Sequence, residues 1–221
     1  MTTIAIFGGT GYAGSAIRDE ALKRGHKVIS ISRSGAPDGV TGTPGVEFRR
    51  GSVHDASLVG QVAAEADVIV VAIRFAPGGS GDGGAKLADA LPALTAAAAA
   101  HGTRVGVVGG ASSLLVAEGG PRLFDTPEFP EQFKPEAGSG IEALEVLRAD
   151  TTGADWFFVS PAAAFGAYNP GQPTGSYRVG GDILLTDESG KSEISGADYA
   201  LAFVDEIDSP RHHRTRFTVA H

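Results

Sequence analysis

The sequence predicts an α/β fold in which a mostly parallel sheet carries helices on both faces. Short apolar runs alternate with longer segments of helical periodicity along most of the chain, as expected for consecutive βαβ units. The run over residues 67–73 is apolar almost throughout, which is typical of a central parallel strand buried on both faces. A glycine-rich turn, Gly8–Gly14, joins the first strand to the first helix. Together these features predict a Rossmann-type doubly wound parallel sheet.

The first strand, turn and helix have the arrangement that binds a dinucleotide pyrophosphate. Gly8 permits a tight exit from the strand, and Gly14 lets the helix pack closely against it. Gly11 has no Cβ, so backbone N–H groups can approach phosphate oxygens, which the helix N-terminus also attracts. The alternative is a glycine-rich turn that binds nothing. We expect cofactor contacts from Gly8, Thr10, Gly11, Tyr12 and Ala13.

The second strand is expected over residues 27–31. The residue that follows it indicates whether NAD(H) or NADP(H) binds. An acidic residue here would hold the 2′-hydroxyl of the adenosine ribose. This chain has Ser32-Arg33-Ser34 instead, and a guanidinium fits a 2′-phosphate in bidentate fashion. We therefore expect NADP(H) to be favoured over NAD(H). The alternative is that Arg33 is only a solvated loop charge.

The third strand, residues 46–50, leads into a turn that we expect near the adenine. Ser52 and the backbone of Val53 are the candidate contacts. Ser52 and Asp55 also fit turn and capping roles before a helix over about 56–66. For Ser52 both roles stay open, whereas for Asp55 the cap is favoured.

The segment after the fourth strand lies where ligands bind in open α/β sheets. We expect cofactor contacts from Ala72, Ile73 and Arg74. Arg74 either contacts a phosphate or an anionic substrate, or is only a solvated charge of its loop. The glycine-rich residues 75–84 that follow are expected to form a mobile loop over the cofactor.

Two further residues are expected beside the nicotinamide. Ser112 follows the fifth strand, residues 104–110, and could orient a substrate carbonyl or ring nitrogen as a catalytic residue; a turn or N-cap serine is the alternative. Pro161 follows the sixth strand, residues 155–160. Trp156 and Phe165 are candidates to line the pocket.

The remaining segments complete one domain over residues 1–221. A helix over 85–100 contains Pro92, which predicts a kink or a late start. Residues 116–135 lack a clear period and predict a long loop at the pocket mouth or at a subunit contact. Residues 167–195 are expected to form a small substrate-side β appendage of short strands. The other expected elements are helices over 139–149 and 196–207 and a closing strand over 215–219.

Composition excludes several classes of function. The net charge of −8 disfavours nucleic acid, because phosphate backbones attract basic surfaces. The chain has no cysteine, and its histidines lack zinc-type spacing, so no metal site is expected. No apolar run approaches the roughly 20 residues of a membrane span, and the N-terminus lacks a basic signal region. We expect a cytoplasmic monomer or homodimer that acts on a small molecule.

Several segments resemble the atypical short-chain dehydrogenase/reductases of the NmrA-like, NAD(P)H-binding group. Within that group the chain is similar to NADH–flavin reductases and biliverdin/flavin reductase relatives. The resemblance implies hydride transfer from NADPH to a flavin- or quinone-like acceptor. Its segments are Gly8–Gly14, Ser32-Arg33, Val107–Ser113, Ile141–Arg148, Asp155–Pro161 and Gly180–Ala200.

The chain departs from this group where a proton donor is usual. Typical members carry Tyr-x-x-x-Lys, in which the lysine lowers the pKa of a catalytic tyrosine. No tyrosine here has a lysine four residues on, and Lys134 follows Gln132 and Phe133. Flavin-reducing relatives place a histidine shortly after the strand-six proline, where this chain has Ala162–Ala164. A flavin- or quinone-like acceptor can take its proton from water. A non-catalytic NADP(H) sensor is the main alternative, and a sugar-nucleotide epimerase or dehydratase ranks last.

Overall fold

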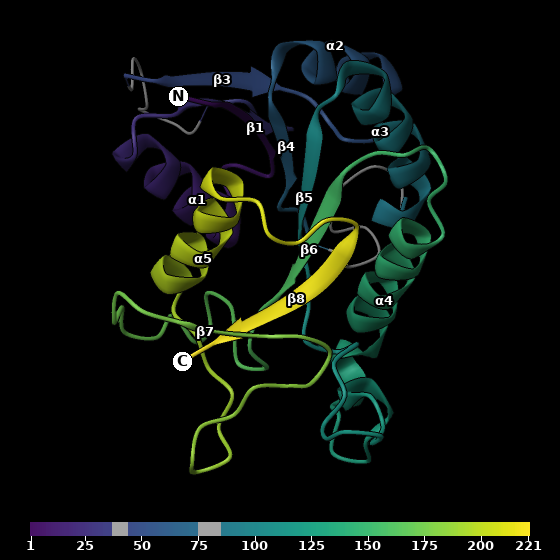
Figure 1. The fold of residues 1–221 in the computed structure, drawn as a ribbon, viewed down its shortest axis with the longest axis vertical. Coiled ribbons are helices and arrows are strands. Elements are labelled where there is room, and N and C mark those ends of the chain that lie inside the picture. Colours follow the sequence, from purple (N-terminus) through teal and green to yellow (C-terminus); the bar gives the residue numbers. More distant parts are fainter. Residues whose placement is uncertain (37–43, 75–84) are drawn as a thin grey trace.

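The computed structural model describes residues 1–36, 44–74 and 85–221. Within them eight strands form one sheet (Figure 1), in the order β3-β2-β1-β4-β5-β6-β8-β7. All neighbouring strands are parallel except β7 and β8. The predicted doubly wound sheet with a small C-terminal β addition is confirmed. The strands are β1 (Thr3–Phe7), β2 (Lys27–Ser32), β3 (Val46–Arg50), β4 (Val68–Val71), β5 (Arg104–Val108), β6 (Trp156–Ser160), β7 (Arg178–Gly180) and β8 (Thr215–Ala220).

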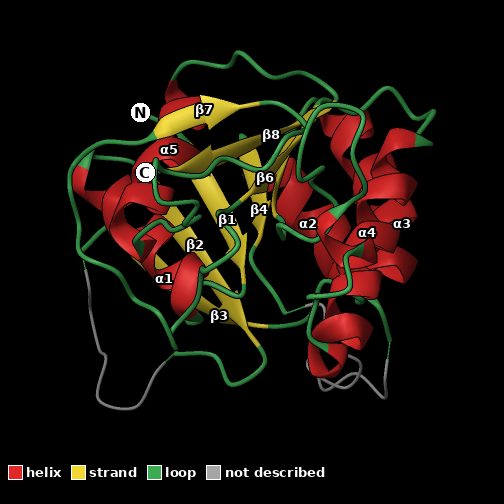
Figure 2. Ribbon diagram, turned by 90° about the horizontal axis from the view of Figure 1, so that it is seen from below, coloured by secondary structure: helices red, strands yellow, loops and turns green. Residues whose placement is uncertain are grey.

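Helices cover both faces of the sheet (Figure 2). One face carries α1 (Tyr12–Lys23) and α5 (Gly196–Asp208), and the other carries α2 (Ala56–Glu65), α3 (Leu87–His101) and α4 (Lys134–Arg148). Alternate strand residues point to opposite faces, so each layer has its own apolar core. The α1/α5 layer packs on Ile4 and Ile6 of β1, and the other layer packs on Ala5 and Phe7.

The chain changes direction across the sheet between β1 and β4, and the glycine turn lies at that point. Gly8 has a φ of +87°, and a Cβ there would lie 2.4 Å from the carbonyl oxygen of Ala72. A Cβ on Gly14 would lie 2.1 Å from the carbonyl oxygen of Gly8. Both distances are far shorter than any real Cβ contact. The expected tight strand exit and close helix packing are therefore present at these two glycines.

Two helices on the second face differ from the sequence prediction at their starts. Helix α4 begins at Lys134 instead of 139, with Pro135 in its first turn, where the missing proline N–H breaks no helical bond. Gly138 and Gly140, which follow this turn, hide its helical periodicity in the sequence. Helix α3 begins at Leu87 instead of 85 and continues through Pro92, so the helix does not start late at that proline.

The C-terminal β addition is smaller than predicted. Of the three expected short strands, only β7 is a strand, and it pairs with β8. The other two pieces pair with loops of the main fold through isolated bridges, Leu115 with Ile183 and Ala164 with Glu193. They therefore hold the loops that follow β5 and β6, and do not form a sheet of their own.

A buried carboxylate ties one of these loops to α5. Asp198 is 1% exposed and accepts hydrogen bonds from Ser195 Oγ at 2.7 Å and from the backbone N–H groups of Thr174 and Gly175, both at 2.8 Å. His221 Nε2 lies 2.8 Å from the same carboxylate. Burial alone would raise the pKa of Asp198, but these hydrogen bonds outweigh it and lower the pKa below 3.8.

We expect Asp198→Asn to lower the free energy of unfolding by about 2 kcal/mol at pH 7, because it removes a buried charged acceptor. A lowered native pKa stabilises the fold above the unfolded pKa, and this stabilisation is lost as the pH falls through the native value. The difference between wild type and variant should therefore shrink below about pH 4. Urea unfolding at pH 7, 5 and 3.5 measures it. A difference that stays constant over this range would contradict the assignment.

Candidate functional site

Two cavities open at the carboxyl edge of the sheet and meet at the glycine turn. The first has a volume of about 310 Å³ and the second about 730 Å³. Gly11, Ala72, Ile73 and Arg74 line both, so the cavities form one continuous groove across the switch between β1 and β4. Each of the thirteen residues predicted for the site lines at least one of them: Gly8, Thr10, Gly11, Tyr12, Ala13, Arg33, Ser52, Val53, Ala72, Ile73, Arg74, Ser112 and Pro161.

The first cavity brings together the ends of β1, β2 and β3. Arg33 lies at its edge and is exposed, beside Ser32 and Ser34. Ser52 and Val53 line the same cavity. Ser52 Oγ also accepts a hydrogen bond from the His54 N–H at 3.2 Å, so Ser52 combines a turn role with a place in the cavity.

Asp55, by contrast, acts as the predicted helix cap. Its carboxylate accepts hydrogen bonds from the N–H groups of Ser57 and Leu58, at 3.0 and 3.1 Å. This cap holds the start of α2 and leaves the cavity to the residues before it.

The start of α1 lies between the two cavities and has no side-chain cap. Its N-cap residue is Gly11, and its first turn contains no acidic residue. The first N–H groups of a helix have no partner within the helix and carry partial positive charge. Gly11 has an ordinary φ of −78°, and a Cβ there would approach only the carbonyl oxygens of Gly8 and Ala72, at 3.3 and 3.9 Å. The turn thus forms an open cradle whose chemistry fits a diphosphate.

The second cavity is built largely from segments that the sequence left without a regular element. Phe129 and Phe133 come from the segment before α4, and Phe165 and Tyr168 from the segment after β6. Residues 116–135 are expected at the pocket mouth or at a subunit contact, and six residues between 123 and 133 line this cavity. The cluster of phenylalanines in an aperiodic stretch was the signal that could have identified these lining residues.

The two aromatic candidates from the sequence have different outcomes. Phe165 lines the second cavity. Trp156 is 1% exposed, packs in the core against the α2–α4 layer and lines neither cavity, so the prediction for Trp156 is wrong. Because β6 is buried on both faces, its first side chain reaches only the core.

Ser112 lies in the second cavity and is 8% exposed. Its Oγ donates a long hydrogen bond of 3.4 Å to the carbonyl oxygen of Ala137 in α4. Its backbone carbonyl accepts from the N–H of Phe124 at 3.0 Å. The hydroxyl is therefore held by α4 at the wall of the cavity.

Arg74 bridges the groove between the cavities. Its guanidinium pairs with the carboxylate of Glu136 in α4 at 3.0 Å, and this pairing raises the pKa of Arg74. The ion pair joins the end of β4 to the first turn of α4. The segment expected to cover the cofactor, residues 75–84, lies outside the described residues.

Three of the four tyrosines lack the environment of a catalytic acid or base. Burial raises the pKa of Tyr12, whose hydroxyl donates to the carbonyl oxygen of Pro170. Burial and a hydrogen bond to Asp205 raise the pKa of Tyr177 to about 12. Burial raises the pKa of Tyr199, which donates to the carbonyl oxygen of Val159. Lys134, the lysine nearest the expected position, pairs with Glu131.

Residues 1–36, 44–74 and 85–221 contain no group of three or more histidine, aspartate or glutamate side chains able to hold a metal ion. In the same ranges no helix has the length and apolar character needed to cross a membrane.

Known proteins match this chain over nearly its whole length. The Bacillus subtilis (strain 168) protein YwnB, described as uncharacterized, is 39% identical over 220 residues, which cover 98% of this chain and 97% of that protein. A Bacteroides thetaiotaomicron structure described as a "putative epimerase" is 34% identical, with a TM-score of 0.84 and coverage of 100% and 97%. A Streptococcus pneumoniae structure described as a "putative NADH-flavin reductase" is 33% identical, with a TM-score of 0.76 and full coverage of both chains.

The family match agrees with the geometry of the turn. A model of the NAD(P)H-binding family matches residues 8–210, from the first glycine of the turn to two residues beyond α5. This range contains every lining residue of the two cavities except Phe7. The chain therefore belongs to the NAD(P)H-binding family.

Proposed function

We propose that the protein is an NADPH-dependent reductase that passes a hydride to a flavin- or quinone-like acceptor. The observation that carries the proposal is the uncapped start of α1 at the junction of two cavities. The smaller cavity has Arg33 at its edge, and the larger one is lined by aromatic rings. This arrangement suits a dinucleotide laid across the turn, with its adenosine end towards Arg33 and its reactive ring in the larger cavity.

In this proposal the chain's own residues bind and orient. The N–H groups at the start of α1 hold the diphosphate, and Ser52 and Val53 flank the adenine. Bound NADPH supplies the hydride. Pro161 and Ala72 flank the reactive ring, while the Ser112 hydroxyl orients the acceptor. The acceptor takes the hydride from NADPH and one proton from water, so alignment of two rings supplies the rate enhancement.

The preference for NADPH rests on Arg33 at the position where an acidic residue would select NAD. The hydroxyl of Ser32 donates to the carbonyl oxygen of Gly35 at 2.7 Å and lies 3.4 Å from Ser34 Oγ. In the proposal, this turn holds Arg33 beside the ribose of the bound nucleotide. A guanidinium beside the Ser34 hydroxyl suits a phosphate dianion.

Two relatives bear on the alternatives. The Streptococcus pneumoniae description supports a flavin acceptor, whereas the Bacteroides thetaiotaomicron description supports an epimerase. Sugar-nucleotide epimerisation usually needs a tyrosine base, and the three tyrosines with raised pKa values disfavour it. The same lack of a tyrosine–lysine pair favours a non-catalytic NADP(H) sensor as the second candidate.

Turnover separates the reductase from the sensor. We expect NADPH oxidation, followed at 340 nm in stopped flow, when riboflavin, FMN, FAD or a quinone is supplied. Binding of NADPH and NADP⁺ with equal affinity, without oxidation by any of these acceptors, would identify a sensor.

Arg33→Ala should weaken NADPH binding by about 10- to 100-fold, the value of a lost charge-assisted contact to phosphate. NADH binding should change by less than about threefold, because NADH has no 2′-phosphate. Calorimetric titration of both nucleotides measures the two effects. Arg211→Ala, an exposed arginine that lines neither cavity, is the matched control. Equal losses for both nucleotides would contradict the role of Arg33.

Gly11→Val should abolish binding of both nucleotides while the protein still folds. The φ of Gly11 is one that any residue adopts, and the added atoms occupy the cradle. Gly60→Val, where a Cβ would meet nothing within 4 Å, controls for the replacement of a glycine by valine away from the cavities. Circular dichroism reports folding and calorimetry reports binding. Undiminished affinity in Gly11→Val would place the diphosphate elsewhere.

A further inference from the structure

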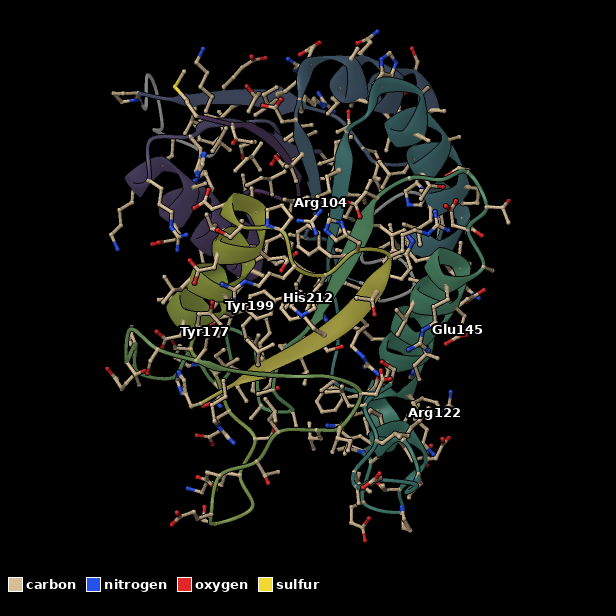
Figure 3. All side chains as sticks on the ribbon, in the orientation of Figure 1. Arg104, Arg122, Glu145, Tyr177, Tyr199 and His212 are labelled. Atoms are coloured by element: carbon tan, nitrogen blue, oxygen red, sulfur yellow. The ribbon has the colours of Figure 1, made fainter. Side chains whose placement is uncertain are left out.

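Aromatic side chains line the second cavity from two sides. Phe165 is fixed by neighbouring rings, 4.5 Å from Tyr199 and 5.4 Å from Tyr12 between ring centroids. Figure 3 shows Tyr199 between α5 and the sheet. On the other side, Phe129 lies 5.5 Å from Phe124. The walls are therefore braced by ring contacts that do not depend on a ligand.

Two further rings of the cavity are exposed to solvent. Phe133 is 50% exposed and Tyr168 is 74% exposed, and they belong to the two opposite segments that line the cavity. Exposed rings that converge on a braced apolar cavity offer faces for stacking against a flat ligand. The shape of the lining thus suits a planar ring system.

The charged side chains of this cavity are unfavourable for an anion. Glu128 and Glu136 line it together with Arg74, the one cation in the described lining. Arg74 is already paired with Glu136. Among the described residues no cation pairs with Glu128. The lining therefore carries an excess of negative charge.

The surroundings do not reverse this charge. The basic residues next to the lining, Arg122 and Lys134, pair with Asp125 and Glu131, at 2.7 and 2.5 Å; Figure 3 shows Arg122 on the loop beside the start of α4. The positive end of α4 already has Glu136 in its first turn.

We infer that the acceptor is an uncharged planar ring system, such as an unphosphorylated flavin or a quinone, and that a phosphate or sulfonate on the acceptor is disfavoured. This inference rests on the proposed reductase function, which leaves the charge of the acceptor open. Ring stacking supplies the attraction. Like charges brought together in the cavity repel, so an anionic substituent is disfavoured.

Matched acceptor pairs test the inference. Riboflavin and FMN share one ring system and differ by a phosphate, and 1,4-naphthoquinone differs from its 2-sulfonate by one charge. We expect kcat/KM to be at least about tenfold higher for the uncharged member of whichever pair is reduced. Equal values, or a preference for the charged member, would overturn the inference and leave the reductase proposal standing. Absence of NADPH oxidation with both pairs would overturn the reductase proposal and the inference with it.

A charge reversal in the lining gives an independent readout. Glu128→Lys should raise the ratio of kcat/KM for FMN to that for riboflavin by about tenfold or more, and added salt should reduce this change. Glu118→Lys makes the same charge change at an exposed position outside the lining and should leave the ratio unaltered. An unchanged ratio in Glu128→Lys, or the same change in Glu118→Lys, would contradict the local electrostatic explanation.

Discussion

The close approach of the glycine turn to the end of β4 is the constraint on which the rest of the site depends. Gly8 leaves no room for a side chain beside Ala72, and Gly14 leaves none beside Gly8. These contacts bring α1 against β1 and aim its N-terminus at the switch in strand order. The end of β4 fixes the turn on one side and α1 fixes it on the other. Both cavities therefore share the same few residues where they meet. Gly11 differs from its neighbours, since its φ is ordinary and a Cβ there would lie 3.3 Å from its nearest atom, the carbonyl oxygen of Gly8.

The first half of the site could be predicted from the sequence because each of its residues follows a strand. In a parallel sheet, residues after consecutive strands gather at one edge, so strand assignment alone brings Arg33, Val53 and Ala72 together. Local chemistry sufficed as well for Asp55, whose capping role depends only on the next three residues. The prediction of NADPH, by contrast, concerns a ligand and stays a prediction.

The second cavity could not be predicted in the same way, because its walls come from long-range contacts between irregular segments. Phe133 precedes α4 and Tyr168 follows β6, and the two line one cavity although they lie far apart in the sequence. Trp156 is a large aromatic residue of the kind that lines pockets, but it lies in a strand that is buried on both faces. The start of α4 was missed because Pro135 and the glycines after it hide the helical period, although a proline is well suited to a first turn. The short strand-like pieces after Gly171 pair with distant loops, which no local pattern encodes.

The two edges of the sheet have a further consequence for the behaviour of the molecule. An unpaired edge strand can recruit another chain through its backbone. At one edge, β3 carries Glu47 and Arg49, which pair with each other and, through Arg49, with Glu65 of α2. At the other edge, β7 has only three residues and offers too short a template. The charged side chains of β3 and the short length of β7 therefore oppose edge-to-edge aggregation. The sheet can remain eight strands wide in a concentrated solution.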